Sequence, residues 1–450
     1  MKWLLERFKS FGMKPFIYDD SSIKTYFDLG VRIQEYEKLL FSDLIEEKSV
    51  VAIVGDYCFE TIALFLAVAK HKCIVVPITS TTRNEIEFRL EEGRVNYTYT
   101  LRNKAFELRV IKEQIKSEST FISNFVKNEI SGLILFSSGS SGKPKAMIHD
   151  LGIMIDLYKD KKAKNLVFMI FLMFDHIGGL NTLLNSLAMG VGITIPKTRD
   201  PEHVCSLIEK YKVNVLPTSP TFLNLILLSE SHKKFNLSSL KLITYGTEPM
   251  PESLLIRINE AFHGVKLLQT FGTSETGIAK VSSKSSSSNL IRFDEPDYEY
   301  KIVDNELWLK SKTQVTGYLN ASNERFTEDG WFMTGDIIEQ HEDGFFRVIG
   351  RNSDQINVGG LKVLPSEVET ILLQIPLVAD CLVYPEPNPI TGHIVVAEIV
   401  PSIVISSQDL KKEIHFFCKN KIDSYKIPVR IKIVGKINYS NRFKKIRKWD

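Results

Sequence analysis

Short apolar runs alternate with amphipathic stretches over the first three quarters of the chain. Residues 49–55 form an apolar, β-branched run that predicts a buried strand, residues 58–70 have helical periodicity, and residues 73–78 predict a second strand. The same order of strand, helix and strand recurs over residues 190–196, 201–211 and 213–216. Repeated strand–helix–strand units predict parallel sheets covered by helices, so the pattern indicates an α/β fold.

A change of pattern near residue 350 predicts a boundary between two domains. The segment from Gly350 to Asp354 is polar and contains glycine, and the sequence after it has the pattern of a compact α+β unit. Polar, glycine-containing junctions are places where few contacts cross and where hinges lie. We predict a large domain of helix-covered, mostly parallel sheets over residues 1–350, a hinge at 351–354 and a small, mobile C-terminal α+β domain over 355–450.

The most apolar and the most polar stretches of the chain give three further expectations. Trp3, Leu4, Phe8 and Phe11 share one helical face, which predicts a helix packed on the core rather than a secretory signal. No uninterrupted apolar run is long enough to span a bilayer, so no membrane insertion is expected. Residues 282–288 are nearly all serine and predict a flexible surface loop.

Composition and charge narrow the possible function classes. The 450 residues are 44% hydrophobic and 25% charged, with a net charge of +3, as expected for a globular protein without a field that attracts nucleic acid. The cysteines are scattered and form neither a CxxC motif nor a His/Cys pair at metal-ligand spacing: Cys58, Cys73, Cys205, Cys381 and Cys418. Their odd number in a large chain favours reduced, packed thiols and a cytoplasmic location.

The strongest local signal for chemistry runs from Leu133 to Lys145, where an apolar strand leads into a loop of serines and glycines. Glycines let backbone N–H groups approach an anion, serine hydroxyls donate hydrogen bonds, and lysines supply positive charge. These residues are Ser137, Ser138, Gly139, Ser140, Ser141, Gly142, Lys143 and Lys145. A P-loop phosphotransferase is disfavoured, because Pro144 stands where a Walker A loop has the magnesium-binding hydroxyl. A plain serine–glycine turn is the alternative for this segment alone.

This segment resembles the phosphate-binding loop T-S-G-T-T-G-x-P-K-G of the adenylate-forming superfamily, with Ala146 in place of the last glycine. That superfamily includes acyl-CoA synthetases, nonribosomal peptide adenylation domains and firefly luciferase. Further segments resemble its patterns in the same order: Tyr245-Gly246-Thr247-Glu248-Pro249, Phe271-Gly272-Thr273-Ser274-Glu275, Trp331-Phe332-Met333-Thr334-Gly335-Asp336, and Gly350-Arg351 through Glu369. The resemblance therefore extends from residue 133 to residue 369.

The resemblance implies an enzyme that uses ATP and Mg²⁺ to convert a carboxylic acid to an acyl-adenylate, releasing pyrophosphate. The acyl group would then pass to a thiol, either coenzyme A or the phosphopantetheine of a carrier protein. The implied ATP-binding residues are the loop from Ser137 to Gly142 with Lys143 and Lys145, then Gly246, Thr247, Glu248, Pro249, Phe271, Gly272, Thr273, Ser274, Asp336, Arg351 and Lys444. Ser274 would meet the α-phosphate, Glu275 would hold Mg²⁺, and Asp336 would accept hydrogen bonds from the ribose hydroxyls.

The C-terminal tail resembles the family's P-K-T-x-x-G-K-x-x-R segment less closely. An alignment without gaps places Lys444 at the catalytic lysine and Arg447 at the arginine. The proline and the glycine of the motif are missing, so Lys445 is an alternative catalytic lysine. A solvated run of charges is the alternative without any catalytic role.

In the family, the small domain rotates about its hinge after adenylation and brings a glycine-containing loop to the thiol tunnel. The resemblance assigns the hinge to Ser353 and Asp354 and the tunnel loop to Gly359 and Gly360. Hinge residues in the family are Asp or Lys, so Ser353 is a departure that concerns the second half-reaction.

The acid pocket is implied by the same resemblance to include Asp175, His176, Thr218, Tyr245 and Gly272. The histidine is typical of acyl-CoA synthetases, whereas an aspartate directly after a phenylalanine is typical of enzymes that activate amino acids. Tyr245 is bulky, which favours a small or medium acid. We favour an acyl substrate, with an amino-acid-adenylating enzyme that loads a carrier protein as the first alternative. The second is a homologue that binds nucleotide or acid but has weakened catalysis.

Overall fold

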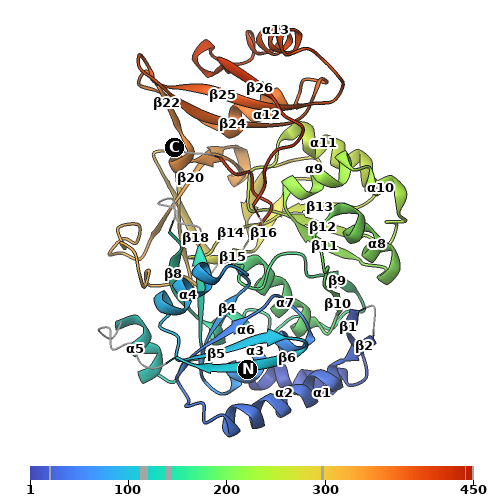
Figure 1. Cartoon of the computed structure of the whole chain (residues 1–450), viewed down its shortest axis with the longest axis vertical. Helices are drawn as coiled ribbons and strands as arrows, with labels where there is room; N and C mark the ends of the chain where they lie inside the picture. Colours follow the sequence, from blue (N-terminus) through green and yellow to red (C-terminus); the bar gives the residue numbers. More distant parts are fainter. Residues whose placement is uncertain (20–21, 112–119, 138–142, 295–297, 441, 448–450) are drawn as a thin grey trace.

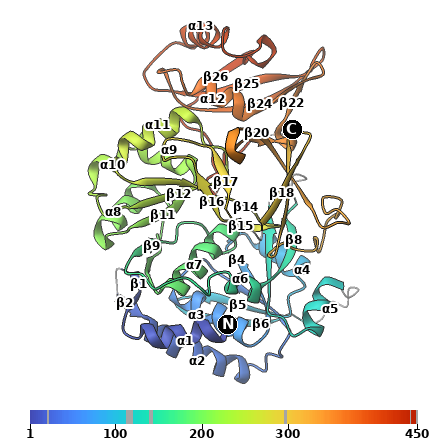
Figure 2. The ribbon, with the colours of Figure 1, turned by 180° about the vertical axis from the view of Figure 1, so that it is seen from behind.

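The computed structural model describes all of the chain except residues 20–21, 112–119, 138–142, 295–297, 441 and 448–450. Figure 1 shows a small unit at the top, which carries α12 (Pro365–Leu372) and α13 (Ser407–Cys418), above a larger body. Figure 2 shows from behind that the same unit meets the larger body on the side of α9 (Pro220–Leu228) and α11 (Glu252–Ala261). The larger body is built on three sheets and a short two-stranded ribbon in the described residues.

The first sheet has seven strands in the order β13-β12-β11-β9-β10-β1-β2, all parallel except for β2. The strands are β1 (Pro15–Asp19), β2 (Ser22–Thr25), β9 (Val167–Met169), β10 (Gly192–Thr194), β11 (Val215–Thr218), β12 (Leu242–Tyr245) and β13 (Lys266–Gln269). The predicted strand, helix and strand within residues 190–216 are confirmed as β10, α8 (Pro201–Tyr211) and β11.

The second sheet has six strands in the order β6-β5-β3-β4-β7-β8, with a parallel centre and antiparallel edges. The strands are β3 (Val50–Val54), β4 (Ile74–Ile78), β5 (Tyr97–Arg102), β6 (Ala105–Val110), β7 (Gly132–Ser137) and β8 (Lys145–Asp150). The predicted helix at 58–70 is α3 (Phe59–Lys70), and every residue from Thr61 to Ala69 is buried. A helix that is apolar on all sides is one that is covered on all sides, and α3 belongs to the largest core cluster.

The remaining helices of the larger body cover these sheets. They are α1 (Lys2–Phe11), α2 (Tyr26–Ser42), α4 (Arg83–Glu92), α5 (Thr120–Lys127), α6 (Leu151–Asp156), α7 (Ile177–Met189) and α10 (Ser231–Lys234). The predicted N-terminal helix is confirmed as α1, which buries Leu4 and Phe8, while Trp3 and Phe11 pack beside them. Within the described residues, no helix combines the length and the apolar character needed to cross a bilayer.

The third sheet is antiparallel, in the order β16-β17-β21-β20-β19-β18, and the ribbon pairs β14 with β15. Their bounds are β14 (Phe271–Thr273), β15 (Gly277–Ala279), β16 (Val281–Ser283), β17 (Ile291–Phe293), β18 (Tyr298–Val303), β19 (Glu306–Ser311), β20 (Phe332–Gln340) and β21 (Phe346–Arg351), with the 3₁₀ turn η1 (Glu342–Gly344) before β21. The prediction of a loop from residue 282 is wrong at its start. Ser282 and Ser283 belong to β16, and the Ser283 hydroxyl accepts a hydrogen bond from the backbone N–H of Gln269 at 3.0 Å.

The small unit has its own sheet in the order β23-β22-β25-β24, with β26 parallel to β25. Its strands are β22 (Ile356–Val358), β23 (Leu361–Val363), β24 (Val378–Asn388), β25 (Gly392–Pro401) and β26 (Arg430–Ile433), and η3 (Ser424–Lys426) precedes β26. α12 and α13 contribute to a separate core cluster over this sheet. The turn η2 (Asn352–Asp354) connects β21 to β22, and a hinge in it stays a prediction.

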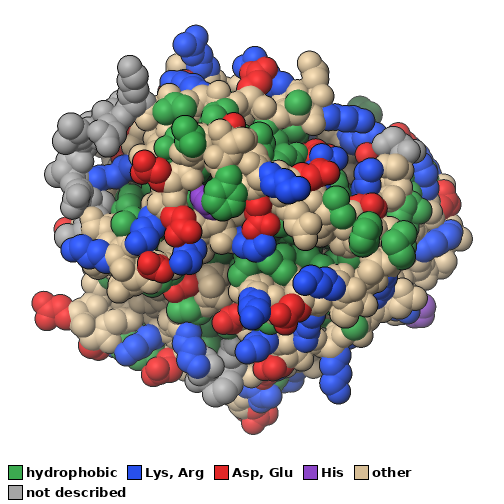
Figure 3. All heavy atoms as spheres, turned by 90° about the horizontal axis from the view of Figure 1, so that it is seen from below, with side chains coloured by type: hydrophobic (Ala, Val, Ile, Leu, Met, Phe, Trp, Pro, Cys, Tyr) green, Lys and Arg blue, Asp and Glu red, His purple; other side chains and the backbone are tan. Residues whose placement is uncertain are grey.

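Neither the surface charges (Figure 3) nor the cysteines depart from what the composition predicts. Figure 3 shows the underside of the molecule, where basic and acidic side chains are interspersed with apolar ones and form no continuous field of one sign among the described residues. All five cysteines are free, and Cys58 alone among them is not fully buried. The prediction of packed thiols is therefore confirmed.

Candidate active site

A cavity of about 600 Å³ lies at the carboxyl ends of strands from both parallel sheets. Ser137 ends β7, Thr218 ends β11, Gly246 follows β12, and Thr270 follows β13, and all four line it. Open parallel sheets expose loop residues at this edge, which is why binding sites form there. The fold therefore brings segments that are far apart in the sequence to one cavity.

Most of the residues predicted for ATP and acid meet in this cavity. Those that line it are Ser137, Lys145, His176, Thr218, Gly246, Thr247, Phe271, Gly272, Thr273, Ser274, Glu275, Arg351, Ser353, Asp354 and Lys444. Lys143 is exposed and lies outside its wall. The predicted phosphate-loop residues Ser138, Gly139, Ser140, Ser141 and Gly142 lie outside the described residues.

A second cavity of about 290 Å³ adjoins the first and shares Gly246, Gly272 and Lys444 with it. Asp336 on β20 lines this second cavity, is 5% exposed, and accepts a hydrogen bond from Arg351 Nε at 2.8 Å on its Oδ1. A buried carboxylate that is paired through one oxygen retains acceptor capacity on the other. The free acceptor capacity of Asp336 suits its predicted hydrogen bonds with the two ribose hydroxyls of ATP.

Two glycines leave the cavity walls without room for a side chain. A Cβ at Gly246 would lie 2.6 Å from Thr270 Oγ1, and a Cβ at Gly272 would lie 2.4 Å from the carbonyl oxygen of Gly277. Real Cβ atoms do not approach other atoms that closely, so both positions need glycine where they line the cavities.

Of these two cavities, Glu248 lines only the smaller, with Pro249, and its side chain is hydrogen-bonded to a helix. Its Oε1 accepts a hydrogen bond from the backbone N–H of Thr221 at 2.7 Å, in the first turn of α9. Burial raises the pKa of Glu248, and the hydrogen bonds from Thr221 oppose this shift. The carboxylate therefore caps α9 where the helix dipole favours negative charge, while Gly246 and Thr247 face both cavities.

Glu275 is held by a residue that sequence reasoning did not select. The hydroxyl of Tyr318 donates a hydrogen bond to Glu275 Oε1 at 2.7 Å, and the ammonium of Lys145 lies 4.9 Å from the centre of the Tyr318 ring. All three line the larger cavity, together with Arg325, which was also not predicted. Tyr318 and Arg325 follow no repeated spacing, so only their place in the fold identifies them.

The donor set around Glu275 fits Mg²⁺ that is held mostly by a substrate. No group of three or more His, Cys, Asp or Glu side chains in the described part of the chain could hold a metal by itself. Mg²⁺ takes one or two carboxylates and completes its shell with phosphate oxygens and water. A single carboxylate, already oriented by Tyr318 and opening on a cavity, is the arrangement that such an ion needs.

His176 lines the cavity as a neutral imidazole. It precedes α7, and its Nδ1 accepts a hydrogen bond from the backbone N–H of Gly178 at 3.0 Å. Burial, followed by the charges of Arg442 and Lys444, lowers the pKa of His176 to about 3. The ring therefore carries its proton on Nε2 and can donate one hydrogen bond without adding positive charge.

Asp175 and Tyr245 are placed differently from the other predicted pocket residues. Asp175 is 3% exposed, and its Oδ2 lies 2.7 Å from Arg89 Nη1 and 3.3 Å from Arg442 Nη2. Burial opposes its ionisation, but the charges of Arg442 and Arg89 outweigh burial and hold the pKa of Asp175 below its usual value. Neither Asp175 nor Tyr245, which is 1% exposed, lines the two cavities, so their contact with an acid stays a prediction.

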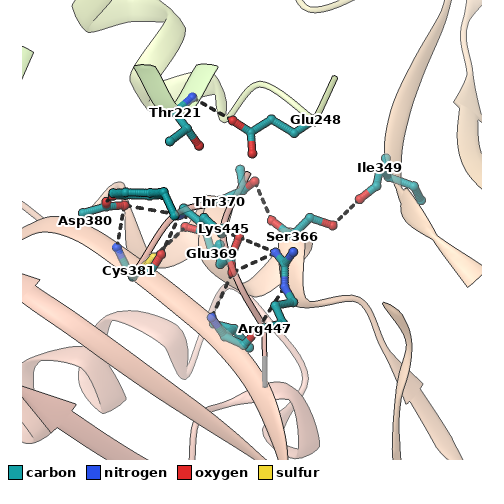
Figure 4. Close-up of polar contacts among 12 residues, drawn as sticks. Thr221, Glu248, Ile349, Ser366, Glu369, Thr370, Asp380, Cys381, Lys445 and Arg447 are labelled. Atoms are coloured by element: carbon teal, nitrogen blue, oxygen red, sulfur yellow. Dashed lines mark hydrogen bonds and ion pairs between the residues drawn. The ribbon is translucent and has the colours of Figure 1, made fainter. Parts of the chain in front are cut away.

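The two neighbouring tail lysines have different surroundings. Lys444 lines both cavities, and burial, followed by the charge of Arg351, lowers its pKa to about 8. Of these two cavities, Lys445 lines only the smaller. Its ammonium lies 3.2 Å from Asp380 Oδ1 and donates a hydrogen bond to the carbonyl of Cys381 at 2.5 Å (Figure 4). Burial opposes the charge on Lys445, but Asp380 and Glu369 raise its pKa above the usual value. The geometry thus favours Lys444 as the lysine that meets a substrate.

Figure 4 shows that the tail is anchored to the small unit by paired charges. Arg447 Nη2 lies 3.0 Å from both oxygens of Glu369 on α12, and the hydroxyl of Tyr439 donates to Asp380. Glu369 Oε1 also accepts a hydrogen bond from the backbone N–H of Val383 at 2.9 Å. The tail anchor, which we define as Tyr439, Lys445 and Arg447 with Glu369 and Asp380, fixes Lys444 to the small unit.

Replacing Glu369 by glutamine is expected to lower the free energy of unfolding of the small unit by about 3 kcal/mol, because two mostly buried cations lose the charge of the buried carboxylate that they share. Urea unfolding of the full chain measures this change. Glu367→Gln on the same helix is the matched control, since it removes one partly exposed pair with Lys426 and should cost less than about 1 kcal/mol. Equal losses in the two variants would contradict the anchoring role of Glu369.

The predicted thiol-tunnel loop lies away from both cavities. Gly359 and Gly360 form the turn between β22 and β23, with φ of 60° and 90°. Both are exposed and line neither cavity, so their role in a tunnel stays a prediction. Ser353 and Asp354, the predicted hinge, do line the larger cavity.

Comparison with known proteins shows which family the chain matches. Residues 5–322 match the AMP-binding enzyme family, and residues 367–444 match the AMP-binding enzyme C-terminal domain. The chain is 25% identical to 2-succinylbenzoate–CoA ligase of Listeria monocytogenes over 97% of this chain and 95% of that protein. It is 26% identical to 4-coumarate–CoA ligase-like 3 of Arabidopsis thaliana over 80% of this chain and 69% of that protein.

Two solved structures have the same fold. The anthranilate CoA ligase AuaEII in complex with anthranoyl-AMP gives a TM-score of 0.83 at 21% identity, covering 98% of this chain and 94% of that one. The o-succinylbenzoate CoA synthetase of Bacillus subtilis, in complex with its acyl-adenylate intermediate, gives 0.76 at 22% identity, covering 99% and 96%. These matches confirm the predicted α/β fold class, with a large N-terminal and a smaller C-terminal part.

Proposed function

Because the chain belongs to the AMP-binding enzyme family, we propose that its cavity activates a small carboxylic acid with ATP and Mg²⁺ and then transfers the acyl group to coenzyme A. The protein is therefore an AMP-forming acid–thiol ligase. The single observation that carries the proposal is the entry of Lys444, from the C-terminal tail, into a cavity that also contains Glu275 and borders Asp336.

Adenylation brings two anions together, which explains the charges in the cavity. A carboxylate oxygen of the acid attacks the α-phosphorus of ATP, the bond from that phosphorus to the bridging oxygen breaks, and pyrophosphate leaves. The protein needs to supply no nucleophile; it has to align the reactants and stabilise the charge at phosphorus. Lys444 and Arg351 supply positive charge, and Ser274 supplies a hydroxyl at the cavity wall. Mg²⁺ held on Glu275 would neutralise phosphate charge.

The walls of the cavity support a compact acid with at least one hydrogen-bonding group. Besides His176, the polar residues Asn181 and Thr182 of α7 line it, and the buried Thr218 hydroxyl has no hydrogen-bond partner among the described residues. A buried hydroxyl without a partner is costly unless a ligand supplies one. Three of the related proteins are named for 2-succinylbenzoate, 4-coumarate and anthranilate, which supports aromatic acids as the first class to test.

The amino-acid alternative receives less support from the geometry. A substrate ammonium would need an unpaired carboxylate, and the one predicted for this purpose, Asp175, already faces two guanidinium groups. Transfer to a carrier protein instead of coenzyme A remains a second proposal, as does a cytoplasmic location.

ATP–pyrophosphate exchange with a panel of aromatic, fatty, hydroxy and amino acids tests the proposal. We expect exchange with one or more compact aromatic acids, and formation of a thioester when coenzyme A is added. Exchange that is confined to amino acids would favour the amino-acid-adenylating alternative. No exchange with any acid, in a protein that still binds ATP, would favour a nucleotide- or acid-binding homologue without turnover.

The pH dependence of adenylation is expected to follow Lys444. Because its pKa is lowered to about 8, the ammonium is charged below that pH and loses its charge above it. The kcat/KM for adenylation should therefore fall by about tenfold per pH unit on the alkaline side. Lys444→Arg keeps its charge at high pH and should remove this fall. A wild-type profile that stays flat to about pH 10 would contradict the role of Lys444.

A further inference from the structure

The residues on either side of Lys444 contact opposite parts of the molecule. Lys445 and Arg447, on its C-terminal side, pair with Asp380 and Glu369 of the small unit. Arg442 and Phe443, on its N-terminal side, contact the larger body. Figure 1 shows the dark red tail descending from the small unit toward the larger body, beside α9.

Phe443 packs against the core of the larger body. Its ring centre lies 5.2 Å from that of Phe171, which follows β9, and 5.0 Å from that of Phe222 on α9. Both partners are fully buried, and Phe443 packs against the cluster that they belong to. The hydroxyl of Ser219, which caps α9, donates a hydrogen bond to the Phe443 carbonyl oxygen at 3.3 Å.

The backbone of Phe443 is strained, and the ring contacts of its side chain offset this strain. Its φ is 53°, in the left-handed region that residues with a side chain rarely adopt. Glycine would occupy this conformation without strain, and the corresponding position of the resembled tail motif is a glycine. A phenylalanine there is stabilised by the contact of its partly buried ring with two buried aromatic rings.

Arg442 forms the second contact of the tail with the larger body. Its Nη2 lies 3.3 Å from Oδ2 of Asp175, the oxygen that also accepts a hydrogen bond from Arg89 at 2.7 Å. Asp175 is buried next to His176, so Arg442 ends at the wall of the cavity that Lys444 enters. Asp175 would keep one cationic partner, Arg89, if Arg442 moved away.

We propose that Arg442 and Phe443 form a clasp that holds Lys444 in the cavity during adenylation and has to open before the thiol step. This inference rests on the proposed function and deepens it. The two are positioning residues, since they act through Lys444 and through the placement of the small unit. The tail anchor alone fixes Lys444 to the small unit, whereas the clasp fixes it to the larger body, where the phosphates would bind.

The clasp affects the two half-reactions in different ways, which separates it from a purely structural role. Loss of the ring in Phe443→Gly, or of the charge in Arg442→Ala, should slow ATP–pyrophosphate exchange by about 10- to 30-fold, the loss expected for one buried contact. Thioester formation from a supplied acyl-adenylate and coenzyme A should be unchanged or faster. Arg442→Lys should restore part of the exchange, and Phe443→Leu should restore more than Phe443→Gly.

Phe416→Ala is the matched control, because Phe416 lies on α13 of the same unit and is 76% exposed. It should change neither half-reaction. Equal slowing of both half-reactions in Phe443→Gly would overturn the clasp, because it would indicate general damage. Unchanged exchange in both Phe443→Gly and Arg442→Ala would overturn it as well.

Hydrogen exchange of the full chain without substrates tests the clasp independently of any activity. Backbone amides of residues 171–175 and 219–222 should exchange faster in Phe443→Gly than in the wild type, and those of α13 should not change. Unaltered exchange at both segments would overturn the clasp. Failure of the proposed function can be told apart from failure of the clasp. It would appear as a wild-type protein that shows no ATP–pyrophosphate exchange with any acid, whatever the hydrogen exchange at these amides.

Discussion

Lys444→Ala is expected to slow ATP–pyrophosphate exchange on the order of 10²–10³-fold, the effect of removing one preorganised electrostatic donor. Lys444 lines both cavities, and no other lysine in the described part of the tail lines the larger one. The Michaelis constant for ATP should rise less than the rate falls, because the ammonium acts mainly on charge that develops at the α-phosphorus. Initial rates of exchange over a range of ATP concentrations measure both quantities.

Lys445→Ala is the matched control for this experiment. The variant removes the same charge from the next residue, but the ammonium of Lys445 is paired with Asp380 and bonded to a backbone carbonyl of the small unit. It should lower the free energy of unfolding and slow exchange by less than about tenfold. A greater loss of exchange in Lys445→Ala than in Lys444→Ala would transfer the catalytic assignment to Lys445.

Glu275→Gln is expected to have an effect of similar size, a loss on the order of 10²–10³-fold in adenylation. The substitution keeps the shape and removes the negative charge that would attract Mg²⁺. The Mg²⁺ concentration that gives half of the maximal rate should rise, and titration of exchange activity with Mg²⁺ measures it. The hydrogen bond from Tyr318 can persist, because the amide oxygen of glutamine also accepts.

Tyr318→Phe separates orientation from charge at the same place. It leaves the carboxylate of Glu275 intact and removes the donor that holds Oε1 at 2.7 Å. We expect a loss of about tenfold in exchange, since one neutral donor to a charged group is removed. If Tyr318→Phe were as slow as Glu275→Gln, the carboxylate would act through Tyr318 rather than on a metal ion.

The fold could be predicted where apolar runs are long and bounded by turns. The helix at 58–70 and the strands on either side of it appeared as expected, because a segment buried on all sides is apolar throughout. Only the start of the serine-rich segment did not follow its composition. Ser282 and Ser283 pair with Arg292 and Ile291, and such pairing between strands depends on a partner outside the local sequence.

The candidate site was predictable to the extent that it follows strand ends and glycine turns. The segments around Ser137, Gly246 and Gly272 meet in one cavity because carboxyl ends of parallel strands share an edge. Tyr318, Arg325 and Arg442 were missed, since each contributes one side chain from a segment without a recognisable spacing.

The amino-acid sequence by itself determined the family, two strand–helix–strand units and the chemistry of the turns, because these depend on neighbours along the chain. Only the tertiary structure separated Lys444 from Lys445 and showed Asp175 paired with two arginines. Adjacent lysines have equal charge and reach, so their roles are decided by which distant carboxylates and cavities lie within a few ångströms. That proximity is a property of the packed chain.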